Sequence, residues 1–108
     1  MVCDRTARLV ARLENLPFPH MTLAQAADIA CMEPSAFSRF FHHRIGVKFS
    51  EFLRAYRVSR ALQEMEQGDA PLKVIAGRAG FRSLATFDRA VKRETGASPS
   101  RVRHALFR

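Results

Sequence analysis

An approximate internal repeat is the feature of this sequence that most restricts its fold. Leu23 and Ala27 match Leu72 and Ala76 at an offset of 49 residues. Four more identities follow at an offset of 50, joining Phe37, Arg39, Gly46 and Ser50 to Phe87, Arg89, Gly96 and Ser100. One residue has therefore been inserted into the second copy, near Arg82. A chain of 108 residues with this repeat has room for two very small units and a connector between them.

Both copies show the apolar spacing of α-helices. Apolar residues recur three and four positions apart, no alternating strand pattern persists, and glycine and proline fall between the periodic segments. The sequence therefore predicts an all-α protein with seven helices, near 4–15, 22–30, 34–44, 50–66, 72–79, 83–94 and 99–107. Thr22 is expected to cap the second helix and Ser50 or a neighbour the fourth, while Ser98 precedes Pro99 at the start of the last.

The repeated unit consists of a short helix, a tight turn and a second helix. Small residues on the inner face of the first helix permit a close, steep crossing; they are Ala26, Ala27 and Ala30, and Ala76 and Ala79 in the second copy. This is the layout of a helix-turn-helix. We expect a first subdomain at 1–49, a connecting helix at 50–66 and a second subdomain at 67–108. The connecting helix offers apolar residues to both cores: Phe52, Leu53, Tyr56, Ala61, Leu62 and Met65.

The second helix of each copy carries two distinct faces. Positions 37, 40, 41 and 44 share one face of a helix, which we expect to be core. Another face carries side chains that suit base edges and phosphates in a major groove, namely Ser35, Ser38, Arg39 and His42. The equivalent set in the second copy is Ala85, Asp88, Arg89 and Lys92. One such face alone would be an ordinary solvated surface, but its duplication on a basic chain favours DNA.

The charge of the chain narrows the class of partner. Its formal net charge is +8, and 15 of its 18 basic residues are arginine. Nucleic acid and an anionic membrane surface are the two acidic partners that this charge favours. Arginine provides a bidentate fork for phosphate and guanine, although a GC-rich genome would also enrich arginine. The main alternative to DNA binding is thus a basic helical module that binds proteins or a membrane surface.

The 4–15 helix is the segment that best fits the membrane alternative, because it is rich in arginine. Its two acidic residues dilute that charge, and we expect Leu9, Val10 and Leu13 to cover the core of the first copy instead. No signal-peptide core and no apolar run long enough to cross a bilayer occur in the sequence. We therefore expect a cytoplasmic protein without a membrane partner.

Enzyme and metal chemistry find little support in the sequence. The GxSxG, Walker and HExxH motifs are all missing, and the carboxylates are scattered. His42 and His43 point about 100° apart on one helix, so they cannot clamp one ion together with Cys31. We expect no cofactor, no metal and no enzymatic activity. The two cysteines are predicted to stay outside any disulfide, with Cys31 as a small core residue.

The stretch from Ile75 to Arg103, IAGRAGFRSLATFDRAVKRETGASPSRVR, resembles the DNA-binding domain of AraC/XylS-type bacterial transcription regulators. The likeness covers about residues 20 to 103. Its motif residues are Ile75-Ala76, Gly80-Phe81, Phe87, Arg89, Gly96 and Ser98-Pro99, with Arg57, Ala61 and Met65 in the connecting helix. Val91 and Thr95 depart from the aromatic residues common in that family, and Asp88 would repel phosphate unless it accepts from cytosine or pairs with Arg89 or Lys92.

The resemblance implies a regulator that places helices 34–44 and 83–94 in adjacent major grooves, as a monomer on double-stranded DNA. RNA polymerase is a candidate second partner. The predicted base-contacting residues are Ser35, Ser38, Arg39, Ala85, Asp88 and Arg89. The predicted phosphate-contacting residues are His42, His43, Lys48, Arg82, Ser83, Lys92 and Arg93.

Charge also predicts a division of labour between the copies. Residues from 72 onward carry nine basic and two acidic side chains, whereas residues 1–71 carry nine basic and eight acidic ones. The first copy is therefore expected to read bases and the second to anchor mainly to phosphates. The chain is too short for the effector-binding domain that most family members carry. Either it is a stand-alone regulator, which the initial Met favours, or it is an excised domain.

Overall fold

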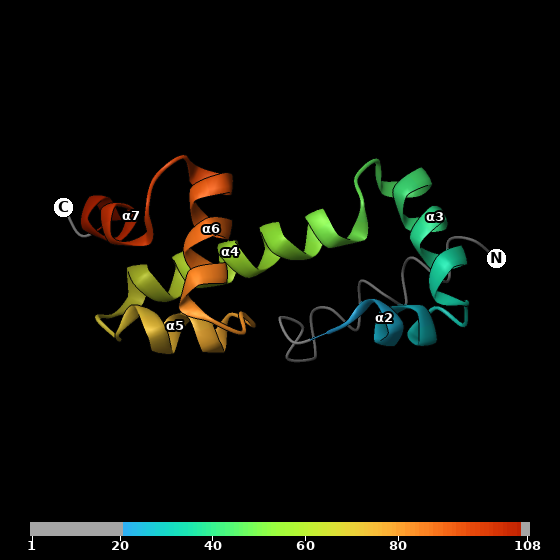
Figure 1. Ribbon diagram of the computed structural model, residues 1–108, viewed down its shortest axis with the longest axis horizontal. Coiled ribbons are helices and arrows are strands. Elements are labelled where there is room, and N and C mark those ends of the chain that lie inside the picture. Colours follow the sequence, from blue (N-terminus) through green and yellow to red (C-terminus); the bar gives the residue numbers. More distant parts are fainter. Residues whose placement is uncertain (1–20, 107–108) are drawn as a thin grey trace. The chain divides into compact units, whose positions relative to one another are not determined.

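The computed structural model describes residues 21–106 of the chain, and within this range all regular secondary structure is helical. The six helices are α2 (Leu23–Ile29), α3 (Pro34–Ile45), α4 (Phe49–Gln67), α5 (Leu72–Arg78), α6 (Leu84–Thr95) and α7 (Pro99–Leu106) (Figure 1). Each lies within one residue of its predicted bounds. The seventh predicted helix, 4–15, falls outside the described residues.

The chain divides into two compact units, Met1–Phe52 and Leu53–Arg108. We call them unit 1 and unit 2. The division falls inside α4, whose first turn belongs to unit 1 and whose remaining length belongs to unit 2. The predicted connecting helix, 50–66, therefore packs for most of its length with the second copy of the repeat.

Unit 1 begins with a helix whose first turn is closed by a capping box. The Thr22 hydroxyl accepts from the Gln25 N–H at 3.1 Å, and the Gln25 side chain accepts from the Thr22 N–H at 2.9 Å. This confirms Thr22 as the N-cap, and the reciprocal pair satisfies two backbone donors that a helix start leaves open. Ala26 and Ala27 are buried on the inner face of α2, which lets α3 cross close by (Figure 1).

The core of unit 1 is built from aromatic rings. Phe37 is fully buried, and the Phe49 ring meets the Phe37 and Phe41 rings at centroid distances of 5.4 and 5.2 Å. Both pairs meet edge to face, the arrangement that aromatic quadrupoles favour. Phe49 is the first residue of α4, one position before the predicted start, so the end of the first copy supplies a ring to its own core.

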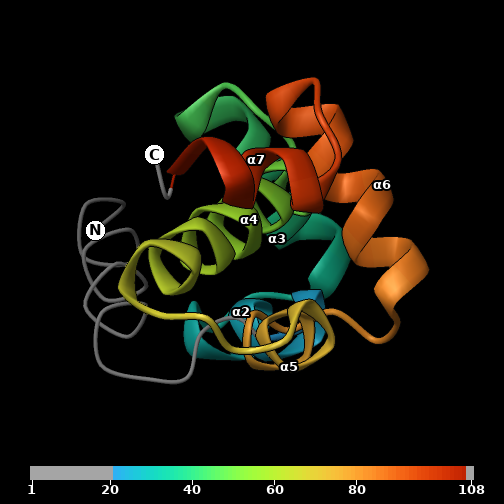
Figure 2. The ribbon, with the colours of Figure 1, turned by 90° about the vertical axis from the view of Figure 1, so that its left-hand side faces the viewer.

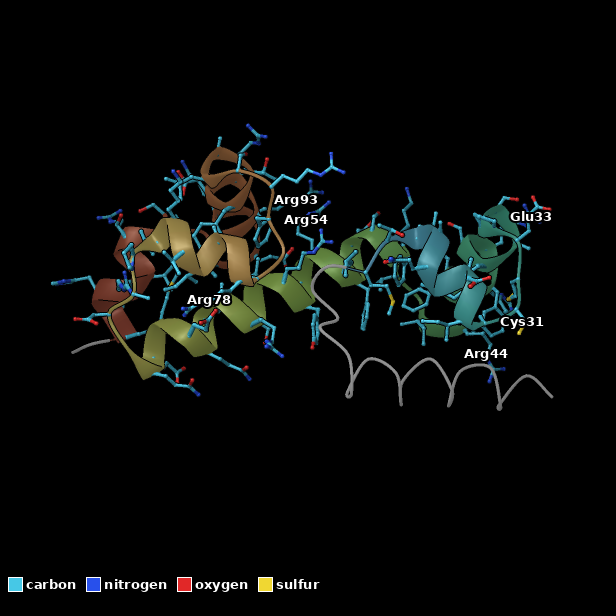
Figure 3. All side chains as sticks on the ribbon, turned by 90° about the horizontal axis from the view of Figure 1, so that it is seen from below. Cys31, Glu33, Arg44, Arg54, Arg78 and Arg93 are labelled. Atoms are coloured by element: carbon cyan, nitrogen blue, oxygen red, sulfur yellow. The ribbon has the colours of Figure 1, made fainter. Side chains whose placement is uncertain are left out.

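Two predictions about the core of unit 1 were wrong. Arg44 shares a helix face with Phe37 and Phe41 but is exposed, because it lies in the last turn of α3, where a cation in water also complements the helix dipole. Cys31 is exposed as well, because it lies in the turn that follows the C-cap of α2, where it adopts a left-handed conformation with φ of 58°. Figure 3 shows both side chains pointing away from the helices.

Unit 2 has a mainly aliphatic core between α5 on one side of α4 and α7 on the other, with α6 alongside (Figure 2). Met65, Ile75, Phe87 and Val91 are fully buried in it. Phe81, in the turn before α6, lies edge to face on Phe87 at a centroid distance of 5.3 Å. The Arg103 guanidinium donates to the Gly68 and Ala70 carbonyl oxygens, which joins α7 to the segment after α4.

The turns that join the two helices of each repeat have the same backbone geometry. The Met32 N–H donates to the Ala27 carbonyl oxygen at 2.9 Å, and the Phe81 N–H donates to the Ala76 carbonyl oxygen at 3.0 Å. In each turn the residue just before the donor is left-handed, Cys31 in unit 1 and Gly80 in unit 2. This is the helix ending that a C-terminal left-handed residue produces, and it directs the second helix of each pair steeply away from the first (Figure 1).

Candidate nucleic-acid interface

The candidate interface is carried by α3 and α6, the second helix of each helix-turn-helix. We call them the recognition helices. Each has 12 residues and ends at a left-handed glycine whose N–H donates back into the last turn, Gly46 to His42 at 2.9 Å and Gly96 to Lys92 at 2.8 Å. Each is anchored by one fully buried ring, Phe37 or Phe87. The anchored face fixes which residues the opposite face presents to solvent.

The polar face of α3 is accessible. Ser35, Arg39, His42 and His43 are exposed, whereas Ser38 is half-buried at the border of the core face. The Ser35 hydroxyl donates to the Glu33 carboxylate at 3.1 Å, so a base would have to compete with this bond. Lys48 is exposed directly before α4.

A shallow hollow lies on the C-terminal half of α3. Arg39, His42, His43 and Gly46 line it. Arginine donates to anions at any physiological pH, and histidine donates from one ring nitrogen when neutral and from both when protonated. The hollow therefore has the chemistry to receive a phosphate group, and it joins one predicted base reader to two predicted phosphate contacts.

The polar face of α6 is accessible along its whole length. The exposed residues include every contact predicted on this helix and the turn before it: Arg82, Ser83, Ala85, Asp88, Arg89, Lys92 and Arg93. Within residues 21–106, no ion pair joins Asp88 to Arg89 or Lys92. Asp88 is thus left to accept from a base amino group or to repel phosphate.

A chain of hydrogen bonds runs along the first turns of α6. The Ser83 hydroxyl accepts from the Thr86 N–H at 3.1 Å, which makes Ser83 the N-cap. The Ser83 and Thr86 hydroxyl oxygens lie 3.0 Å apart, and the Arg89 Nη2 donates to the Thr86 oxygen at 3.5 Å. Ser83, predicted to contact phosphate, therefore already serves the helix end, and Thr86 links it to Arg89.

A second basic group lies near the turn of unit 2. Burial lowers the pKa of the Arg57 guanidinium from its usual value, and the positive charge of Arg82 lowers it further. Arg57 nevertheless stays charged, because guanidinium groups are not deprotonated in proteins. Two like charges from α4 and from the turn before α6 thus act on the same region, where a bound phosphate would offset their repulsion.

Two residues of this surface were not among the predicted contacts. Thr86 could have been found by its position three residues before Arg89, a spacing that places side chains side by side on a helix. The sequence places Arg57 only in the motif of the connecting helix, and its nearness to Arg82 depends on how α4 packs in unit 2. The sequence around Arg57 does not indicate how α4 packs.

The chain has two helix-turn-helix units, and the second helix of each exposes a polar face. This arrangement places it in the class of helix-turn-helix DNA-binding domains. A family model described as "Helix-turn-helix domain" matches residues 26–105. The chain belongs to the AraC-type helix-turn-helix family of transcription regulators, as the resemblance predicted. This family consists of regulator DNA-binding domains and is not an enzyme family.

Three similar proteins illustrate the relationship. The arabinose operon regulatory protein of Salmonella typhimurium is 29% identical over 90 residues, which cover 83% of this chain and 32% of that protein. The transcriptional regulator RipA of Corynebacterium glutamicum is 34% identical over 97 residues, covering 89% of this chain and 29% of that protein. The chain thus spans about a third of the length of these curated relatives.

A solved structure gives the third comparison. The DNA-binding domain of the global transcriptional factor AdpA, in complex with a target DNA, is 32% identical to this chain, with a TM-score of 0.81. The match covers 92% of this chain and 89% of the AdpA domain.

Across residues 21–106, none of the helices is both long and apolar enough to cross a membrane. In the same part of the chain, no three histidine, cysteine or acidic side chains gather as a metal site would require.

Proposed function

We propose that this chain binds double-stranded DNA sequence-specifically as the DNA-binding part of a transcription regulator, with α3 and α6 in adjacent major grooves. The observation that carries the proposal is the pair of equivalent recognition helices, each anchored by a fully buried phenylalanine and each presenting an exposed polar face. Membership of a family whose AdpA member is solved with its target DNA supports it.

The contacts follow from the chemistry of the exposed side chains. Arg39 and Arg89 occupy equivalent positions, and arginine donates bidentately to guanine. The remaining proposed base contacts are Ser35, Ser38, Ala85 and Asp88. His42, His43, Lys48, Arg82, Ser83, Lys92 and Arg93 are proposed to contact phosphates, which position the protein without carrying sequence information.

The DNA site should be asymmetric. One chain already carries two readers, so two-fold symmetry is not needed, and the proposed binding species is a monomer in the cytoplasm. The expected site is non-palindromic and about two helical turns long. RNA polymerase is a proposed second partner on the grounds of the family alone.

The test is selection of binding sites from a random duplex library, followed by gel shifts with the selected and a scrambled duplex. We expect one non-palindromic site and tighter binding to it than to the scrambled duplex at equal salt. Selection without enrichment, or a palindromic site bound by a dimer in sedimentation, would overturn the proposal. Co-sedimentation with anionic vesicles but equal affinity for both duplexes would favour the membrane-surface alternative.

A further inference from the structure

A chain of hydrogen bonds joins Ser83, Thr86 and Arg89. Arg89 is the only cationic side chain among the base contacts predicted in unit 2. All three residues are exposed, so the chain belongs to the surface rather than to the core. Ser83 is held in place by its cap bond to the Thr86 N–H at 3.1 Å, and the two hydroxyl oxygens lie 3.0 Å apart. Thr86 is therefore fixed before Arg89 reaches it.

The bond from Arg89 to Thr86 gives the guanidinium a direction. Side chains on a helix lean toward its N-terminus, and residues three apart are neighbours on its surface. The bond is 3.5 Å long, at the outer limit for a hydrogen bond, so it contributes little to the stability of the fold. It draws Arg89 toward the N-terminal half of α6, which is the part of a recognition helix that meets base edges.

The bond also leaves the guanidinium able to read a base. Nη2 carries two hydrogens and Thr86 accepts only one of them, so the other, together with those on Nη1, can donate to guanine O6 and N7. Asp88 precedes Arg89 directly, points about 100° away around the helix and makes no ion pair with it in the described range. The hydroxyl is thus the group that holds Arg89 without neutralising it.

Unit 1 has no equivalent device. Arg39 corresponds to Arg89, but the position of Thr86 is occupied by Ala36, whose methyl group accepts no hydrogen bond. Within residues 21–106 no hydrogen bond or ion pair holds the Arg39 guanidinium. The two readers therefore differ in how far they are ordered before DNA arrives.

We propose that Thr86 is a positioning residue that pre-orients Arg89 for reading a guanine through unit 2, an inference that rests on the proposed DNA-binding function. Thr86 acts through Arg89 and needs no contact with the base. Ordering a long side chain before binding removes part of the entropy that its immobilisation would cost. Unit 2 then discriminates at one base pair although its neighbouring side chains, Ala85 and Asp88, offer little to a guanine.

The test uses the full chain and the site selected from the random library. Arg89→Ala locates the base pair that Arg89 reads, as the one position where discrimination against substituted duplexes falls, by about 5- to 150-fold. Thr86→Val, which keeps the shape and the backbone N–H of the cap, should lower discrimination at that same position by about two- to tenfold. Thr86→Ser, which keeps the hydroxyl, should behave like the original protein.

The outcomes separate this inference from the proposed function. A chain that selects no site overturns both. If the chain selects a site but Thr86→Val discriminates like the original at the Arg89 position, or weakens all positions equally, the positioning role is wrong and DNA binding stands. If Arg89→Ala changes no single position, Arg89 reads no base and the inference fails. In a variant that combines Arg89→Ala with Thr86→Val, the second substitution should have no further effect on discrimination, because the guanidinium that Thr86 positions is absent.

Discussion

The two units share a backbone plan but carry different charge. In the described part of unit 1, residues 21–52, three basic side chains face three acidic ones, which gives a net charge of zero. In unit 2, residues 53–106 hold eleven basic and five acidic side chains, a net charge of +6. Unit 2 therefore has the stronger field for phosphates, and unit 1 must rely on the donors of α3 itself. The predicted division of labour rests on this difference, and the role proposed for Arg89 keeps unit 2 from being a pure anchor.

The cores differ in where their aromatic rings come from. The positions of Phe41 and Phe49 in unit 1 are taken by Val91 and Pro99 in unit 2, while Met32 is replaced by Phe81. Val91 is nonetheless fully buried, and Phe81 packs on Phe87. Compared with unit 1, unit 2 thus has an extra aromatic ring in the turn and lacks the rings of the recognition helix's second half and of the start of the next helix. Small units can thus reach a closed core by different routes, provided that the central ring is kept.

The largest test of this comparison removes the central ring of either unit. Phe37→Ala and Phe87→Ala should each lower the free energy of unfolding by about 3–5 kcal/mol, since both rings are fully buried and truncation leaves a cavity. Thermal unfolding followed by far-UV circular dichroism measures the effect.

Phe40→Ala is the matched control, because its ring is only half-buried on the same helix and its loss should cost clearly less. An unchanged melting temperature in either central variant would show that the unit does not depend on its ring. Calorimetry would also show whether one substitution shifts the transition of one unit only.

The sequence predicted the six described helices well because the repeat supplied two views of the same periodic pattern. It also placed the polar faces, since a buried ring fixes which residues lie opposite. The prediction that Cys31 is a core residue was wrong, because Cys31 lies in the turn with a left-handed backbone angle. In the sequence, only the glycine at the equivalent position, Gly80, indicates that angle. The nearness of Arg57 to Arg82 could not be predicted either, because it depends on tertiary packing.

The next test concerns the two recognition helices on DNA. Arg39→Ala should cost about 1–3 kcal/mol at one base pair of the selected site and little on a scrambled duplex. Lys92→Ala should weaken binding to both duplexes alike and flatten the slope of log affinity against log salt by about one. Affinities measured between about 50 and 200 mM salt on both duplexes decide between the roles.

The reverse result would exchange the roles of the units. If Arg39→Ala weakens both duplexes equally while Lys92→Ala loses discrimination, α6 is the main reader and unit 1 is the anchor.

A smaller effect is expected from exchanging the left-handed residues of the turns. Gly80→Ala should lower the free energy of unfolding by about 1–2 kcal/mol, because a Cβ is strained at a positive φ. Cys31→Gly should raise it by up to about 1 kcal/mol, since it relieves that strain but adds freedom to the unfolded chain. Cys31→Ala separates the backbone effect from loss of the thiol, because it keeps a Cβ at the same backbone angle. Equal effects of Cys31→Gly and Cys31→Ala would show that the backbone angle at Cys31 stores no strain.

The smallest expected difference lies at the starts of the recognition helices. Ser83 accepts a cap hydrogen bond from the Thr86 N–H, whereas the N-cap of α3, Glu33, makes no such bond with its side chain. Ser83→Ala should therefore lower the free energy of unfolding by about 1 kcal/mol. Glu33→Ala should change it by less than about 0.5 kcal/mol, because within residues 21–106 the Glu33 carboxylate holds only the exposed Ser35 hydroxyl. Chemical denaturation without DNA measures both, so that effects on reading do not enter. Equally small losses in both variants would mean that the first turn of α6 is held by the packing of unit 2 and not by its serine.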